Sequence, residues 1–115
     1  MDKEIIEHIN ELFDSYDLFS GTGRKKVSDS IKRRFPNIAK EKIKELEDYL
    51  DEFYKYCVEY ADVIANKYKT PFLPKCEEAQ KEIAEYVREC KKQYPQFDEQ
   101  KVIGIFSTVC WLANR

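Results

Sequence analysis

The chain has 115 residues, 20 of them basic and 22 acidic, and its net charge at neutral pH is −2. Hydrophobic residues make up 43% and aromatic residues 14%, which excludes intrinsic disorder and predicts a single helical domain over residues 1–115. The first residues lack the order of a secretory signal, and the longest mostly apolar run, 102–113, is too short to cross a bilayer. We therefore expect a cytoplasmic protein with no membrane partner.

Helical spacing of apolar residues defines the first two predicted elements. From Lys3 to Tyr16 the apolar side chains fall on one side of a 3.6-residue period, which predicts one amphipathic helix. The glycine-containing segment 20–23 breaks it. A short helix with the basic segment 24–34 follows, and Pro36 ends it. This second helix is expected to pack Val27, Ile31 and Phe35.

The third predicted helix is the longest, at about 37–69, with Asn37 as its N-cap and no glycine or proline inside. At 1.5 Å per residue it would span about 46 Å, whereas a compact chain of this size is roughly 35 Å across. We therefore expect an elongated bundle of about five helices built on this central helix. Its apolar residues alternate steps of four and three, the a/d seam of a heptad, at Ala39, Ile43, Leu46, Leu50, Phe53, Cys57, Tyr60 and Ile64.

Two further helices complete the prediction. Pro74 suits the first turn of a fourth helix, and Asp98 is the predicted N-cap of a fifth that runs to the C-terminus. No segment shows the strict alternation of a strand, so the predicted fold class is all-α. The fourth helix is expected to bury Cys76, Ala79, Ile83, Val87 and Cys90.

The cysteines are the first residues to consider for chemistry. They contain no C-x-x-C pair, and each falls on the apolar stripe of its predicted helix, where free cysteine acts as a small hydrophobic residue. Cys76 and Cys90 would lie about 21 Å apart on one helix, too far to share a zinc ion or a disulfide. One disulfide between helices, or a two-ligand site, is the alternative. The set is Cys57, Cys76, Cys90 and Cys110.

Catalytic motifs are also missing from the sequence. His8 is the only histidine, and there is no Ser-His-Asp set, no Glu-x-x-His motif and no Walker A loop. Because these motifs are absent and the cysteines are expected in the core, we predict no catalytic residue, no metal and no cofactor.

Charge is segregated along the chain, and the basic part is a candidate binding surface. Residues 24–44 hold nine Lys or Arg and two acids, a balance of +7, whereas residues 45–66 hold seven acids and one lysine, a balance of −6. A basic helix that begins after a glycine loop can hold a phosphate or a nucleic-acid backbone through its amides and cations. The alternatives are a solvated face or pairing with the acidic half. The candidate contacts are Arg24, Lys25, Lys26, Lys32 and Arg33.

The last helix is apolar nearly all round, which is typical of a buried helix or an interface. Small residues four apart allow another backbone to approach, and its tryptophan is a residue type enriched at interfaces. A second apolar strip lies beside the heptad seam of the long helix, where Tyr49, Tyr56 and Val63 repeat every seven residues. The alternatives are a last helix at the centre of its own fold and a wide core face on the long helix. The candidate interface comprises Gly104, Ile105, Thr108, Trp111, Leu112, Tyr49 and Tyr56.

These features favour a small cytoplasmic, non-catalytic module for protein–protein interaction or regulation, whose partner is another protein or a second copy in a homodimer. Nucleic-acid binding through the basic helix 24–34 is the alternative. An enzyme with an unrecognised pocket, or a carrier of an apolar ligand, is a third hypothesis.

Overall fold

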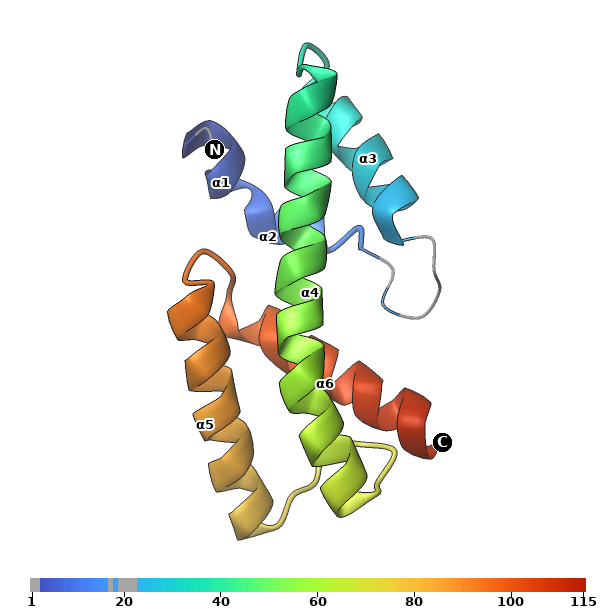
Figure 1. Ribbon diagram of the computed structural model, residues 1–115, viewed down its shortest axis with the longest axis vertical. Coiled ribbons are helices and arrows are strands. Elements are labelled where there is room, and N and C mark those ends of the chain that lie inside the picture. Colours follow the sequence, from blue (N-terminus) through green and yellow to red (C-terminus); the bar gives the residue numbers. More distant parts are fainter. Residues whose placement is uncertain (1–2, 17, 19–22) are drawn as a thin grey trace. The chain divides into compact units, whose positions relative to one another are not determined.

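The computed structural model describes residues 3–16, 18 and 23–115, with the backbone alone for residues 23–26. Within these ranges the protein contains helices and no strand, so the predicted all-α fold is confirmed (Figure 1). The chain forms two compact units, unit 1 (Met1–Phe53) and unit 2 (Tyr54–Arg115). The helices described are α1 (Lys3–Glu7), α2 (Ile9–Phe13), α3 (Gly23–Arg34), α4 (Lys40–Tyr68), α5 (Glu77–Gln93) and α6 (Glu99–Asn114).

In unit 1 the single helix predicted over 3–16 is instead two short helices, α1 and α2, that meet at His8. The backbone of His8 has φ −106° and ψ 10°, and its N–H donates to the carbonyl of Ile5, three residues back, at 3.1 Å. This tighter turn interrupts the α-helix without moving the apolar side chains off one face. Ile5, Ile9, Leu12 and Phe13 are all buried, as the periodicity predicted.

Helix α3 matches the predicted basic helix 24–34 almost residue for residue. Val27 and Ile31 are completely buried, and Phe35, just beyond the helix, is half-buried. Gly23 is the first residue of α3, and the rest of the predicted glycine break, residues 20–22, lies outside the described residues.

The long helix begins three residues later than predicted, so Asn37 is not its N-cap. The N–H of Ile43 donates to the carbonyl of Ala39 at 3.2 Å, which makes Ala39 the capping position. The N–H of Ile38 donates to the carbonyl of Phe35 at 3.1 Å, so Asn37 lies in the turn between α3 and α4.

The predicted heptad seam of α4 is confirmed over most of its length. Ala39, however, is exposed, Tyr60 is half-buried, and Ala61 and Ala65 join the buried face. A straight α-helix drifts by about 20° per heptad from a strict seven-residue repeat, which moves the buried face toward Ala61 and Ala65 by the last turns. The seam residues that are buried are Ile43, Leu46, Leu50, Phe53, Cys57 and Ile64.

Unit 2 packs α5 alongside the C-terminal part of α4, and α6 crosses that part (Figure 1). Asp98 is the N-cap of α6, as predicted, although its side chain makes no capping hydrogen bond. The prediction for Pro74 is wrong. The first helical bond of α5 runs from Gln80 N–H to the carbonyl of Cys76, which is still extended (φ −64°, ψ 154°), so Pro74 is a buried residue of the linker.

The core of unit 2 contains aromatic and aliphatic residues from α6 and from the turn before it. Phe97, Val102, Ile105 and Phe106 are completely buried. Among the described residues, none of the helices is both long enough and apolar enough to cross a membrane.

Candidate functional site

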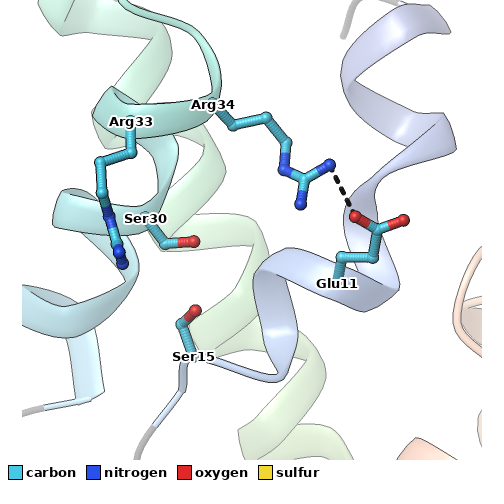
Figure 2. A pocket seen from close by; sticks show the side chains of 5 residues that line it. All are labelled: Glu11, Ser15, Ser30, Arg33 and Arg34. Carbon is cyan, nitrogen blue, oxygen red and sulfur yellow. Dashed lines mark ion pairs between the residues drawn. The ribbon is translucent and has the colours of Figure 1, made fainter.

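A polar pocket of about 400 Å³ lies between α2 and α3 in unit 1 (Figure 2). Ser30, Arg33 and Arg34 come from α3, where residues three and four apart share one side of the helix. Ser15 lies in the turn after α2, where its N–H donates to the carbonyl of Leu12 at 3.1 Å. We call this the α2/α3 pocket; it is lined by Glu11, Ser15, Ser30, Arg33 and Arg34.

The hydroxyl groups of Ser15 and Ser30 face the same space, with Arg33 on one side and Arg34 on the other (Figure 2). Both serines are half-buried, whereas both arginines are exposed. The pocket therefore presents two hydroxyl groups and two guanidinium groups around one opening, with one carboxylate at its edge.

The two arginines differ in their partners. Arg34 Nη1 donates to Glu11 Oε2 at 2.6 Å and lies 3.1 Å from His8 Nδ1. Arg33 makes no ion pair and no hydrogen bond with its side chain in the part of the chain that the structure describes. Among the described residues, one cation of the pocket is thus paired with a carboxylate and the other is not.

Of the two predicted anion contacts whose side chains the structure describes, Arg33 lines this pocket. Lys32 is exposed and is not part of the lining, and the side chains of Arg24, Lys25 and Lys26 lie outside the described residues. Sequence reasoning missed the contributions of Ser15, Ser30 and Arg34. The i, i+3 and i+4 spacing of Ser30, Arg33 and Arg34 was a usable signal on α3, but nothing in the sequence places Ser15 opposite them.

The candidate interface on α6 is partly buried within unit 2. Ile105 is completely buried, so it packs in the core and takes no part in a surface, while Thr108 and Leu112 are half-buried. Gly104 is also half-buried, and, apart from its chain neighbours and the adjacent backbone of α6, no described atom lies within 4 Å of the position that a Cβ would take there. Trp111 is exposed, with 45% of its surface accessible.

The two tyrosines of the candidate interface are half-buried side chains of α4. In unit 2 the ring of Tyr56 lies 5.6 Å from that of Tyr60 and 5.5 Å from that of Tyr94. The hydrogen bond with Tyr60, together with burial, raises the pKa of Tyr56 to about 12. Tyr56 is therefore engaged with its own unit, whereas Tyr49, half-buried, belongs to unit 1.

The segment that follows α4 holds a second exposed aromatic residue, Phe72. Asn114 Nδ2 donates to the carbonyls of Ala65 at 3.1 Å and Thr70 at 3.3 Å, which holds the end of α6 against the segment that follows α4. Thr70 Oγ1 donates to the carbonyl of Phe72 at 2.6 Å, and Phe72 is 55% exposed. Trp111 precedes Asn114 by three residues on α6, and Phe72 follows Thr70 by two, so both lie close in the chain to this contact; we call this pair the aromatic end of unit 2.

Three of the four cysteines are buried, and all four are free thiols. A hydrogen bond to Cys90, reinforced by burial, raises the pKa of the Cys57 thiol, and burial raises that of Cys110. Cys76 is exposed at the N-cap of α5, contrary to the prediction. Within the described ranges, no group of three or more His, Cys, Asp or Glu side chains is arranged to hold a metal ion.

Comparison with known proteins finds no family model, no curated relative and no solved structure that matches this chain.

Proposed function

We propose that this chain is a non-catalytic helical module that binds protein, and that its first partner is a second copy of the chain docked on the aromatic end of unit 2. The observation that carries the proposal is that two exposed aromatic residues, Phe72 (55% exposed) and Trp111 (45%), each lie within three residues of the contact between Asn114 and Thr70. They come from different segments, and the hydrogen bonds of Asn114 join those segments.

Aromatic side chains of this kind suit the centre of an interface. Tryptophan, tyrosine and phenylalanine are enriched in interface cores because they bury a large area at a small cost in side-chain entropy. The guanidinium group of Arg115 lies 5.2 Å from the centre of the Trp111 ring, a cation–π contact that places a positive charge beside the aromatic surface. Arginine is itself an interface-enriched residue.

The test is the oligomeric state of the full chain, measured by native mass spectrometry and by sedimentation over a range of concentrations. We expect a dimer, and we expect the double variant Phe72→Ala/Trp111→Ala to weaken it at least thirtyfold, since loss of a central aromatic residue costs about 2 kcal/mol or more. A monomer at every concentration, or a dimer that the double variant leaves unchanged, would contradict the proposal.

Val63→Ala is the matched control. Val63 has the same exposed fraction as Trp111, 45%, but lies on the side of α4 opposite the buried Ala61, Ile64 and Ala65. We expect it to leave the dimer intact. Circular dichroism of all variants separates loss of association from loss of folding.

Nucleic-acid binding through the basic helix 24–34 is supported by three consecutive exposed cations at the end of α3, Lys32, Arg33 and Arg34. Against it, Arg34 is already paired with Glu11. If this function holds, charge reversal at Lys32 and Arg33 will abolish binding of an oligonucleotide, and raising the salt concentration will weaken it.

A further inference from the structure

We propose that the α2/α3 pocket is a binding site for a phosphate monoester group, held by Arg33, Arg34 and the hydroxyl groups of Ser15 and Ser30. The site lies wholly within unit 1 and needs no contribution from the aromatic end of unit 2. This proposal is therefore independent of the proposed protein-binding function, and each can be tested without the other.

The donors of the pocket match the acceptors of this ligand. A phosphate monoester presents three terminal oxygens and carries nearly two negative charges at neutral pH. Each guanidinium group offers a planar fork of N–H donors that bonds phosphate in a bidentate way, and each serine adds one O–H donor. In Figure 2 the two hydroxyl groups lie between the two arginines, so one phosphate could accept from all four side chains.

The size of the pocket favours an ester over a strand of nucleic acid. A volume of about 400 Å³ is within the range of sites for small organic ligands, so there is room for phosphate and part of the group that carries it. A nucleic-acid backbone would need a row of cations along the surface. Here Lys32, next to Arg33 in the chain, does not line the pocket, and Glu11 occupies one edge.

Glu11 influences both the affinity of the pocket for anions and its selectivity among them. Its single negative charge holds Arg34 at 2.6 Å. A phosphate monoester carries about twice that charge and offers more acceptor oxygens, so it competes for Arg34 more strongly than another carboxylate or a phosphodiester does. Glu11 therefore both discriminates among anions and lowers the affinity for the one that binds.

The experiment is a titration of the full chain at constant ionic strength, followed by the amide resonances of residues 11–34 in nitrogen–proton NMR spectra. The probes are inorganic phosphate, a short glycine-rich peptide with one phosphoserine, the same peptide with serine, and a single-stranded oligothymidylate. We expect saturable shifts at Ser15 and Ser30 with the phosphopeptide and none with the unmodified peptide. Equal affinity for inorganic phosphate would identify free phosphate as the source, and weaker affinity would identify a phosphorylated side chain.

Two pairs of variants of equal charge change locate the site. Arg33→Gln should weaken binding at least tenfold, whereas Lys32→Gln should change it less than twofold. Glu11→Gln should tighten binding at least threefold because it releases Arg34, whereas Glu7→Gln, on the exposed side of α1, should not.

The proposal is overturned if Arg33→Gln and Lys32→Gln weaken binding equally, which would indicate a diffuse basic surface. It is also overturned if no probe gives saturable shifts at the serines, or if the oligonucleotide binds more tightly than the phosphopeptide, which would favour nucleic-acid recognition. The NMR spectra report folding of every variant in the same experiment. The oligomeric state, measured in parallel, is expected to be unchanged by these substitutions.

Discussion

At the scale of single residues, the four cysteines differ in access to solvent and hence in reactivity. Only Cys76 is exposed; the other three are buried, and the pKa values of Cys57 and Cys110 are raised above the ordinary range. The thiolate is the reactive form, so burial and a raised pKa both protect a thiol.

We expect one thiol per chain to react with an aromatic disulfide reagent in the native protein at pH 8, and all four after denaturation. In Cys76→Ser the native count should fall to zero while the denatured count falls to three. Rapid native reaction of two or more thiols would show that the buried cysteines are reached through opening of unit 2.

Most substitutions lower the free energy of unfolding, but replacement of Gly104 by alanine is expected to raise it. Gly104 lies inside α6, and an added Cβ would meet no described atom within 4 Å beyond its chain neighbours and the adjacent helix backbone. Glycine in a helix interior costs about 0.5–1 kcal/mol relative to alanine, because the unfolded chain has more backbone freedom to lose.

Gly104→Ala should therefore raise the free energy of unfolding by roughly 0.5–1 kcal/mol, seen as an increase of a few degrees in Tm. The matched control is Ala84→Gly, at an exposed position in the middle of α5, which should lower stability by a similar amount. A drop in Tm for Gly104→Ala would mean that another chain packs against this glycine, as the small-residue spacing on α6 suggested.

At the scale of helices, a polar cluster joins α4 to α5 in unit 2. Glu82 Oε2 accepts hydrogen bonds from Lys67 Nζ at 3.0 Å and from Tyr68 Oη at 2.8 Å, and its Oε1 accepts one from Tyr86 Oη at 3.0 Å. Burial alone would raise the pKa of the Glu82 carboxyl, but these three hydrogen bonds outweigh it and lower the pKa below its ordinary 4.5.

A lowered pKa in the folded state means that Glu82 stabilises the fold above pH 4.5, and that this contribution is lost as the pH falls through the folded value. Glu82→Gln should cost about 1 kcal/mol at pH 7 in urea unfolding, and the difference from the natural chain should shrink toward pH 3. Glu78→Gln is the control. Its side chain is 75% exposed, against 16% for Glu82, and it reaches only Lys67, so we expect little change. An effect of Glu82→Gln that is independent of pH would contradict this account.

Most of the helices could be predicted from the sequence because their buried faces repeat at a regular period. The two errors at helix starts have a local cause. Asn and Pro are residue types common at the start of helices. In this structure, however, Asn37 lies in a turn and Pro74 lies in the linker before α5. The break at His8 depends on a single tight turn that leaves the periodicity of the side chains intact, so no pattern of apolar residues could reveal it.

The α2/α3 pocket was only partly predictable for a different reason. Arg33 could be identified because it projects from a helix whose buried face was known from Ile31. The pocket residues on the α2 side, Glu11 and Ser15, meet Arg33 only because of how two helices pack. Hydrophobic periodicity contains no information on which polar groups meet across such a packing.

Two contacts hold this part of unit 1 against α4. The rings of Phe13 and Phe53 lie 5.1 Å apart, and Tyr16 Oη donates a hydrogen bond to Asp51 at 2.7 Å.

At the scale of the whole molecule, α4 is the element that belongs to both compact units, since it runs from Lys40 to Tyr68 across the boundary between Phe53 and Tyr54. Its first half supplies core residues to unit 1 and its second half to unit 2. No glycine or proline interrupts it.

The chain has a single tryptophan, Trp111, which lies in unit 2. Fluorescence excited at about 295 nm, where tyrosine hardly absorbs, is consequently an intrinsic optical signal from one unit, while far-ultraviolet circular dichroism sums the helices of both. Midpoints that coincide in the two signals would mean that the molecule melts as one cooperative body. Midpoints that separate would reveal, without any label, an intermediate in which one unit has lost its structure and the other has kept it.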